Sequence, residues 1–347
     1  MKKKLTLAFL VIVLVLFICT KLDSFAIIRT VAAVRHFPGG DRLVMNLEQR
    51  YFAYQDRRDQ EFTQSHNLNF QVIKVQEKAD ELFPAAKTKP AEKYGQWVKK
   101  DWYARTILKP DAKRSGIVNI IVIDGEKANL HFVSGANEPV KGGQGRISRE
   151  DLKKVHLAFS GGFLQEHLPS GCIDDGKILK PLLKGQGTIV ITKAGKVKIG
   201  VWGVDLKIKD QPFEARQGLP LIQKGKFKAK VEYWRWTFLK RAKGEKRTKP
   251  KADPATFMTA IGITSQGNLV YAGGRQLTAD GLAKAMIACG VTEAILLDMN
   301  YGNAFCYFLS YDGKHLKTAD FSDDFPKRQN KFCEQEEKDF FYVTVAN

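Results

Sequence analysis

The segment 259–305 constrains the fold more than any other part of this chain. Two short runs rich in apolar and β-branched residues flank 265–267 (Ser-Gln-Gly), a composition typical of a hairpin turn. Thr278 then provides a suitable N-cap for a helix, and Gly290 lies where such a helix would end. The continuous apolar run 294–297 predicts a strand that is buried on both faces.

Two polar residues, Asp298 and Asn300, follow that predicted strand at once. A polar side chain at the end of a buried strand is held rigidly and faces a crevice, where functional sites tend to form. Asp298 would fit equally well as the cap of a turn, and periodicity does not separate the two roles. Both residues are therefore candidates for a functional site.

The N-terminus predicts export. Three lysines (2–4) precede the apolar run 5–19, and 24–26 (Ser-Phe-Ala) supplies the small residues that a signal peptidase prefers. The run is shorter than the roughly 20 residues of a spanning helix, which favours a cleaved signal peptide within 1–26. Apolar residues in 27–34 leave an uncleaved signal-anchor open. Either form predicts a body that is periplasmic, extracellular or anchored to the outer face of the cytoplasmic membrane.

The rest of the chain divides at a Lys- and Pro-containing segment that ends at Ser115. Residues 27–115 are interpreted as a partly helical appendage or spacer with no assigned function. From Gly116 the pattern is rich in strands: 117–123 and 127–133 predict a hairpin, and 147–155 predicts a short helix. We therefore expect an α+β domain over 116–347, a mixed and mostly antiparallel sheet with a few helices.

Four cysteines lie in the predicted exported body, where disulfides can form: Cys172, Cys289, Cys306 and Cys333. Four cysteines allow three pairings, and the favoured bridge joins Cys306 to Cys333. Cys289 falls on the apolar side of the predicted helix, so we expect a buried thiol there. No CxxC or paired-histidine spacing is present, so the sequence predicts no structural zinc site.

The formal net charge of +19 predicts attraction to polyanions such as nucleic acid, anionic lipid or phosphate-bearing polysaccharide. Part of the excess is local, because 240–251 holds seven Lys or Arg residues against the single Glu245. Such a run is more often a solvated surface loop than a binding site. No nucleic-acid-binding module accompanies it, so we expect no specific nucleic acid partner.

Four blocks of the chain, in this order, resemble the phosphodiester glycosidase domain family, whose members are similar to N-acetylglucosamine-1-phosphodiester alpha-N-acetylglucosaminidase. The blocks are Ala158-Phe159-Ser160-Gly161-Gly162-Phe163; Leu219-Pro220-Leu221-Ile222; Thr259-Ala260-Ile261-Gly262 with Gly274-Arg275, Thr278 and Leu297-Asp298; and Lys338-Asp339-Phe340-Phe341-Tyr342-Val343. The resemblance implies a hydrolase that acts on a sugar-1-phosphodiester in an envelope or extracellular polysaccharide.

Cleaving such a bond needs a carboxylate near the anomeric carbon, and Asp298 is the candidate for that role, with Asn300 as the candidate for an orienting amide. It also needs donors for the phosphate oxygens. Arg275 has a planar fork that matches two of them. Gly161 and Gly162 can offer main-chain N–H groups. Ser160 and Thr278 are secondary candidates, and a second carboxylate is sought among three residues: Glu166, Asp174 and Asp175.

The chain departs from the family pattern at Met258, where the family has arginine, and at Ser160, where it has asparagine. Met299-Asn300-Tyr301 replaces a glycine triplet, and larger side chains there would narrow the approach of an anion to the main chain. These departures leave an alternative open: a non-catalytic relative that binds anionic glycopolymers.

The expected partner is an anionic glycan or a glycosyl phosphodiester, with membrane association through the N-terminal segment. No cofactor and no metal site are expected. The sequence does not decide whether a divalent cation assists, although one Asp–Asn pair provides too few ligands for a dedicated oxygen cage.

Overall fold

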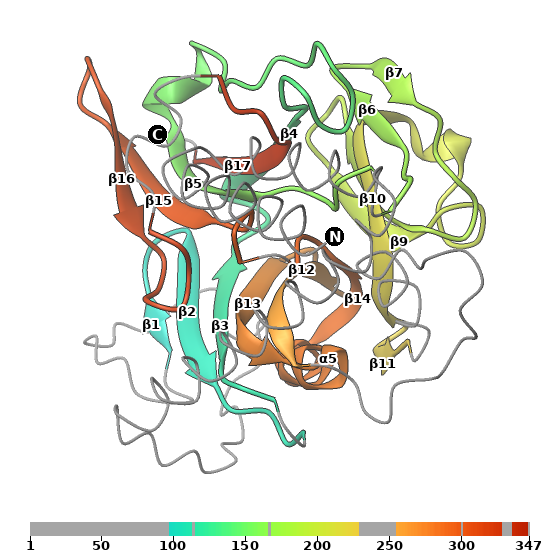
Figure 1. Cartoon of the computed structure of the whole chain (residues 1–347), viewed down its shortest axis with the longest axis vertical. Helices are drawn as coiled ribbons and strands as arrows, with labels where there is room; N and C mark the ends of the chain where they lie inside the picture. Colours follow the sequence, from blue (N-terminus) through green and yellow to red (C-terminus); the bar gives the residue numbers. More distant parts are fainter. Residues whose placement is uncertain are drawn as a thin grey trace, which may run out of the picture. The chain divides into compact units, whose positions relative to one another are not determined.

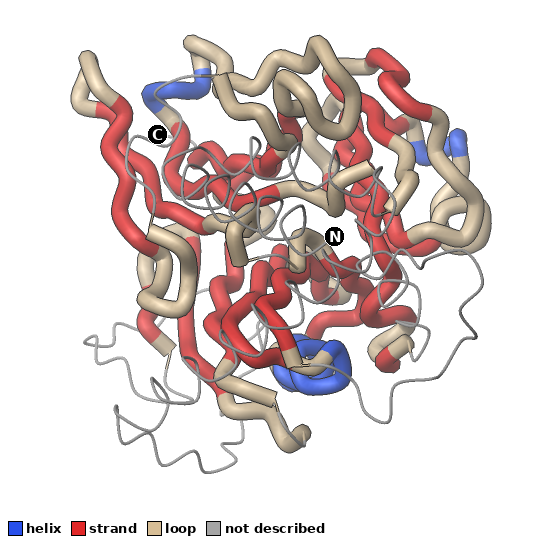
Figure 2. The backbone as a smooth tube through the Cα atoms, in the orientation of Figure 1, coloured by secondary structure: helices blue, strands red, loops and turns tan. Residues whose placement is uncertain are grey.

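Strands dominate the fold (Figures 1 and 2). Neighbouring strands pair antiparallel in both sheets. The computed structural model describes residues 97–112, 115–165, 168–228, 255–299, 301–327 and 335–345. The signal segment, most of the predicted appendage, the basic run 240–251 and three singled-out residues (Glu166, Asn300 and Cys333) lie outside these ranges. The chain divides into two compact units, and all described residues belong to the unit made of Asp59–Phe238 and Lys249–Asn347.

The larger sheet has twelve strands within the described residues, and its main path runs β1-β2-β3-β13-β12-β14-β10-β6-β7. Its strands are β1 (Val98–Lys99), β2 (Tyr103–Leu108), β3 (Val118–Ile123), β6 (Cys172–Asp174), β7 (Lys177–Lys180), β8 (Gly187–Thr192), β9 (Val197–Val201), β10 (Pro212–Gln223), β11 (Lys226–Phe227), β12 (Thr256–Thr264), β13 (Leu269–Leu277) and β14 (Val291–Leu296). β10 pairs with β14 through 219–222 and with β8 through 212–218, so this long strand joins two parts of the sheet.

The smaller sheet has the order β16-β15-β5-β17-β4. Its strands are β4 (Ala128–Val133), β5 (Val155–Ser160), β15 (Cys306–Tyr311), β16 (Leu316–Asp320) and β17 (Phe340–Val345). Buried aromatic rings join the two sheets: the Phe159 ring lies 4.4 Å from that of Tyr271 in the larger sheet and 5.6 Å from that of Phe341 in β17. One hydrophobic core therefore lies between the sheets.

The hairpin and helix predicted from 259–305 are confirmed. β12 pairs with β13 around a turn in which Gly267 has a φ of 96°, a conformation that suits glycine. The Thr278 hydroxyl accepts a hydrogen bond from the Gly281 N–H at 3.1 Å and so caps α5 (Ala279–Ala288). Gly290 follows the helix with a φ of 90°.

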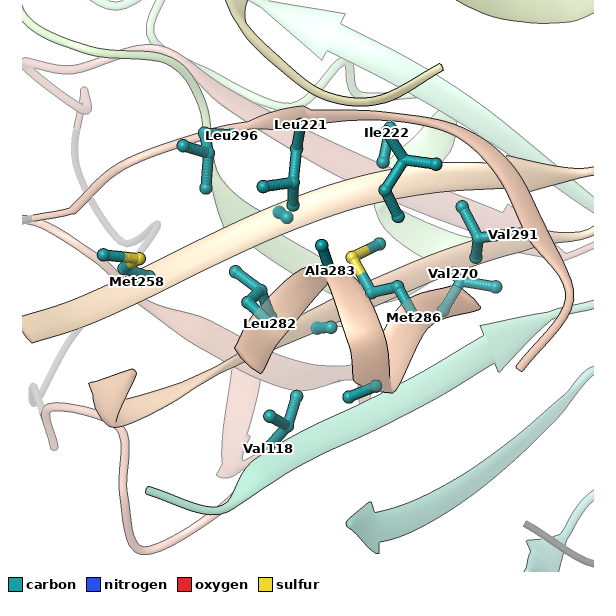
Figure 3. Packing of buried hydrophobic residues seen from close by; sticks show 14 of the residues in the cluster. Val118, Leu221, Ile222, Met258, Val270, Leu282, Ala283, Met286, Val291 and Leu296 are labelled. Carbon is teal, nitrogen blue, oxygen red and sulfur yellow. The ribbon is translucent and has the colours of Figure 1, made fainter. Parts of the chain in front are cut away.

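α5 packs on one face of the larger sheet and forms a second core there (Figure 3). Leu282, Ala283 and Met286 on the helix contact apolar side chains of the strands, which include Val118, Val270, Leu221 and Leu296. Cys289, just after the helix, is fully buried, which confirms the expectation of a buried thiol. Cys306 is also a buried free cysteine, while its predicted partner Cys333 lies outside the described residues.

The predicted α+β class is wrong. α5 is the single α-helix in the described residues, which otherwise form antiparallel strands and two 3₁₀ turns, η2 (Asp151–Lys153) and η3 (Ile208–Asp210). The helix predicted at 147–155 is only η2. Ser148 accepts a hydrogen bond from the Asp151 N–H as a cap would, but Val155 already begins β5 and pairs with β17. Strand pairing thus outweighs a local helix signal that spans barely one turn.

The predicted hairpin of 117–123 with 127–133 is also wrong. β3 pairs with β2 and β13 in the larger sheet, whereas β4 pairs with β17 in the smaller one. The turn between them crosses from one sheet to the other, and a Cβ on Gly125 would lie 2.4 Å from the Gly267 main-chain oxygen. β3 is buried throughout and β4 carries several buried apolar residues, but an apolar pattern does not reveal which strand is the partner of each.

β1 and β2 precede Gly116 yet extend the larger sheet beside β3, and the predicted domain boundary there stays a prediction. Across the described ranges, no helix is long and apolar enough to cross a membrane.

Candidate functional site

Asp298 lies just beyond the end of β14, with its side chain buried. Its Oδ2 accepts a hydrogen bond from Lys338 Nζ in a buried salt bridge. Lys338 stands two residues before β17, so this pair joins the larger sheet to the smaller one. The Asp298 main-chain oxygen accepts hydrogen bonds from the Thr259 N–H at 3.1 Å and from its hydroxyl at 2.8 Å. Asp298 is therefore held through both side chain and main chain.

The two glycines after β5 pack against Asp339, the neighbour of Lys338. The Gly161 N–H donates to the Asp339 main-chain oxygen at 2.9 Å, and the Gly162 N–H donates to Asp339 Oδ2 at 3.1 Å. A Cβ on Gly161 would lie 2.6 Å from Asp339 Oδ2, and a Cβ on Gly162 would lie 2.6 Å from Arg216 Cζ. Both positions thus require glycine for close approach. Both N–H groups donate to Asp339 in this structure. The predicted role of the two glycines toward a phosphate stays a prediction.

Arg216, on β10, forms a fully buried ion pair with Asp339 through an Nε–Oδ2 distance of 2.5 Å. The remaining guanidinium nitrogens donate to Ser170 Oγ at 2.5 Å and to the main-chain oxygens of Gln217 at 2.9 Å and Phe163 at 2.7 Å. Burial opposes the charge, but the Asp339 carboxylate holds the pKa of Arg216 above its ordinary value. Arg216 is therefore a charged group held by four hydrogen bonds, and it is central to a cluster that includes Asp339, Gly161 and Gly162.

One oxygen of this ion pair, Asp339 Oδ1, is buried without a hydrogen-bond partner among the described residues. Ser160 ends β5 and is paired with Phe340, the residue after Asp339. Burying a polar oxygen without a partner costs about 1–3 kcal/mol, so native proteins rarely leave one in place without a reason. A polar group of a ligand or a water would relieve that cost here.

Glu138 is a partly exposed carboxylate of the same cluster. Its Oε2 accepts a hydrogen bond from the Gln165 N–H at 3.1 Å. Burial raises the pKa of Glu138, and the negative charge of Asp339 adds to the shift, while the Gln165 bond and the cations Arg216 and Lys338 oppose it. A carboxyl group with a raised pKa among charged groups is typical of functional sites and suits a proton donor.

Arg275 contacts the loop that follows Asp298. Its Nε donates to the Asp324 main-chain oxygen at 3.1 Å, and its Nη2 donates to the Tyr301 hydroxyl at 2.5 Å. The guanidinium carbon also lies 4.2 Å from the centre of the Tyr301 ring, a cation–π contact. One of the residues that replaces the family's glycine triplet therefore covers the predicted phosphate-binding arginine.

The structure does not bring Thr278 to this cluster, because its side chain caps α5 in the core on the helix side of the sheet. Met258 and Met299, two of the departures from the family pattern, are buried in that same core.

Two of the other carboxylates considered for the site, Asp174 and Asp175, lie within the described residues. Asp174 Oδ2 accepts hydrogen bonds from the main-chain N–H of Ser134 at 3.0 Å and from its hydroxyl, and burial raises the pKa of Asp174. Asp175 is exposed in a turn with a φ of 48°. Nearby, Glu214 on β10 accepts a hydrogen bond from the Phe132 N–H at 2.7 Å, and burial raises the pKa of Glu214 to about 7. The described ranges contain no group of three or more potential metal ligands.

No family model and no curated protein sequence matches this chain. Among solved structures, it is similar to the catalytic domain of zebrafish N-acetylglucosamine-1-phosphodiester alpha-N-acetylglucosaminidase, auto-inhibited by its pro-peptide. That similarity has a TM-score of 0.46 and 17% identity, and it covers 75% of this chain and 88% of the other. A hypothetical protein from Synechocystis is also similar, with a TM-score of 0.44 and 10% identity over 71% of this chain and 62% of the other. A proposed exported protein from Burkholderia pseudomallei has a TM-score of 0.34 and 10% identity over 66% of this chain and 74% of the other. At such identities the similarity concerns the fold alone.

The sequence therefore predicted four members of this cluster, Ser160, Gly161, Gly162 and Asp298, and missed the charged residues between them. Lys338 and Asp339 stand in the last of the four blocks that resemble the family, and neither was a candidate for the site. Charges directly before the four apolar residues 340–343 are a usable signal for buried ion pairs. Arg216 offered a similar signal, as a charge within the buried part of β10. Glu138, in an irregular loop, offered none.

Proposed function

We propose that this protein is an exported glycosidase-type hydrolase that cleaves a sugar-1-phosphodiester in an envelope or extracellular polysaccharide. The observation that carries the proposal is the convergence of Asp298, Lys338, Asp339, Arg216 and the Ser160–Gly162 corner at the meeting point of the two sheets. The motif resemblance supplies the class of substrate, and the predicted signal segment supplies the location.

In the proposed reaction, water adds to the anomeric carbon while the bond from that carbon to the phosphate oxygen breaks. Asp298 accepts the proton of the attacking water, and Lys338 fixes the position of its carboxylate. The phosphomonoester leaves with the electron pair of the broken bond, and Glu138 donates a proton to it. Arg275, with Ser160, is the proposed contact for the phosphate oxygens, and Asn300 is proposed to orient the sugar.

The test of Asp298 must separate catalysis from folding, because Asp298→Asn alone leaves Lys338 as an unpaired buried cation. We would therefore compare Asp298→Asn with the double variant Asp298→Asn/Lys338→Met, which removes both charges. Release of sugar or phosphomonoester from a panel of sugar-1-phosphodiesters should fall by about 10²–10⁴-fold in both. A double variant that keeps wild-type turnover would exclude Asp298 as the catalytic carboxylate.

Glu138→Gln tests the proton donor with little risk to the fold, since glutamine keeps an acceptor for the Gln165 N–H. Turnover that needs protonated Glu138 should decline as pH rises through the raised pKa of this group. The variant should lose most of its activity, together with that alkaline decline. An unchanged pH profile in Glu138→Gln would assign the donor to another residue.

A second candidate function, binding of anionic glycopolymers without catalysis, is favoured by the position of Tyr301 over Arg275. A protein of this kind would release nothing from the panel yet bind a phosphate-bearing polysaccharide. Its affinity would be the same in the Asp298→Asn/Lys338→Met variant. Tyr301→Gly discriminates further, because opening the loop should increase turnover in an enzyme and should not create turnover in a binding protein.

A further inference from the structure

Within the described residues, the four large hydrophobic side chains that are exposed all lie in a single stretch, 177–209. They are Ile178, Leu183, Val204 and Ile208, with exposed fractions of 62%, 42%, 57% and 73%. Single exposed apolar residues are common, but exposed apolar residues that gather on one surface mark an interaction site.

The segments that carry these side chains are neighbours in space. The Gly185 N–H donates to the Trp202 main-chain oxygen at 2.9 Å, and the Trp202 N–H donates to the Gln186 oxygen at 2.9 Å. A Cβ on Gly203 would lie 2.8 Å from Lys184 Cγ. The loop of Leu183 and the loop of Val204 therefore lie side by side, on the side of β7 and β9 in Figure 1.

A small buried cluster lies beneath these loops and anchors them. It consists of Ile173, Val190, Leu206 and Ala215, with Leu182 and Trp202 packed against it. Ile178 is paired with Ile173 across β6 and β7, so it is tied to the same cluster. The exposed apolar side chains thus surround a packed support.

The same stretch is strongly basic. Between Lys177 and Lys209 the sequence has eight lysines (177, 180, 184, 193, 196, 198, 207 and 209) and one acidic residue, Asp205. The Asp205 carboxylate accepts hydrogen bonds from the Val201 N–H at 3.0 Å and from Gln223 Nε2 at 2.6 Å. Exposed lysines flank the apolar side chains directly, as Lys184 does beside Leu183 and as Lys207 and Lys209 do on either side of Ile208.

We propose that this 177–209 surface docks onto an anionic lipid bilayer. Aliphatic side chains enter the boundary between headgroups and acyl chains, while lysine ammonium groups stay at the anionic headgroups. An anionic polysaccharide would attract the lysines but offers the aliphatic side chains no apolar phase. The combination of the two residue types therefore favours a lipid surface over a glycopolymer.

The surface is also connected to the candidate site. Gln217, next to Arg216 on β10, accepts a hydrogen bond from the Leu183 N–H at 2.8 Å and donates to the Leu183 oxygen at 3.0 Å. The loop of Leu183 is thus fixed to β10, the strand that carries Arg216. The inference goes beyond the proposed function and does not depend on it.

The test must distinguish this surface from the apolar N-terminal segment, which would enter any bilayer. An environment-sensitive fluorophore is attached to Val204→Cys in the full chain, with Cys19→Ser and Cys333→Ser as the labelling background. Ala319→Cys, exposed on β16 in the other sheet, is the matched control position. The vesicles contain either phosphatidylglycerol with phosphatidylcholine or phosphatidylcholine alone.

We expect the emission of the probe at 204, and not at 319, to shift to the blue with the anionic vesicles only. Leu183→Ser/Ile208→Ser should abolish the shift. Lys184→Gln/Lys207→Gln/Lys209→Gln should weaken vesicle affinity at least tenfold, since one lysine near an anionic surface contributes roughly fivefold. Circular dichroism and the midpoint of thermal unfolding check that these surface variants stay folded.

Four results would overturn the proposal. Equal shifts at 204 and 319 would mean that the chain associates through the N-terminal segment alone. A shift that survives Leu183→Ser/Ile208→Ser, or one that soluble dextran sulfate reproduces, would assign the surface to polyanions instead of lipid. A probe at 204 that is already in an apolar environment without vesicles would show that another segment of the chain covers the surface.

Discussion

At the residue scale, the Arg216–Asp339 pair shows how a charge can be buried completely in this fold. The guanidinium donates to a carboxylate, a hydroxyl and two main-chain oxygens, so little of its hydrogen-bonding capacity is lost with the water. Because desolvation nearly cancels the Coulombic attraction of such pairs, their net contribution to stability is small, but removing one partner is costly.

Asp339→Asn should therefore destabilise the protein by about 3–5 kcal/mol, since it leaves the Arg216 charge buried without its counter-ion. Arg216→Met/Asp339→Leu should lie much closer to the wild type. Urea denaturation followed by tryptophan fluorescence measures both values. A single substitution that costs less than the double one would contradict this account of the pair.

At the element scale, α5 depends on a cap that the resemblance had also placed in the site. Thr278→Ala should cost about 1 kcal/mol in the free energy of unfolding, because it removes the acceptor for the Gly281 N–H. Thr278→Ser keeps that acceptor and is the control. If Thr278 only caps the helix, turnover of a phosphodiester substrate will be the same in all three proteins. A raised KM in Thr278→Ala alone would instead support phosphate binding.

The contact of β10 with β4 gives a second prediction at this scale, because burial raises the pKa of Glu214 from 4.5 to about 7. The folded protein then holds a proton that the unfolded chain has released. The stabilising contribution of protonated Glu214 is therefore complete below about pH 4.5 and is lost as pH rises to about 7.

Glu214→Gln should remove this pH dependence while keeping an acceptor for the Phe132 N–H. Relative to the wild type, the variant should gain on the order of 2 kcal/mol between pH 4.5 and 8. Denaturation across that pH range measures the difference. Glu126→Gln, at an exposed position, is the control and should show no such trend.

At the scale of the whole molecule, the core between the two sheets holds the larger sheet to the smaller one. Phe341 packs on Phe159 and Phe132 there and is fully buried. Phe341→Ala should cost about 3–5 kcal/mol. Ile178→Ala, at an exposed position, should change stability by less than about 0.5 kcal/mol. If the larger sheet of Phe341→Ala unfolded at the same denaturant concentration as in the wild type, the two sheets would not share a core.

The sequence predicted the fold best where local signals agree. In 259–297 the turn glycine, the threonine cap and the apolar strand specify the same hairpin, helix and strand, and the structure has all three. The sequence-based prediction failed at β3 and β4. A pattern of apolar residues indicates that a strand is buried, but it does not indicate which strand is its partner. The prediction failed at 147–155 for a related reason, since long-range pairing with β17 begins at Val155.

The candidate site divides in the same way. Motifs found Asp298, Gly161 and Gly162, because the residue types that mark them stand together in short stretches of sequence. They could not find that Lys338, Asp339 and Arg216 complete the cluster, since those contacts join positions 40 to 123 residues apart. The position of Tyr301 over Arg275 was equally hidden, although its replacement of glycine was visible.

The pairing of β4 and β5 with β17 has a consequence for biosynthesis. β4 spans 128–133, and its only strand partner in the described residues is β17 at 340–345, so β4 cannot take its place in the smaller sheet until that distant segment has been synthesised. Early segments must wait with their apolar side chains unpaired, which slows folding and lengthens exposure to chaperones.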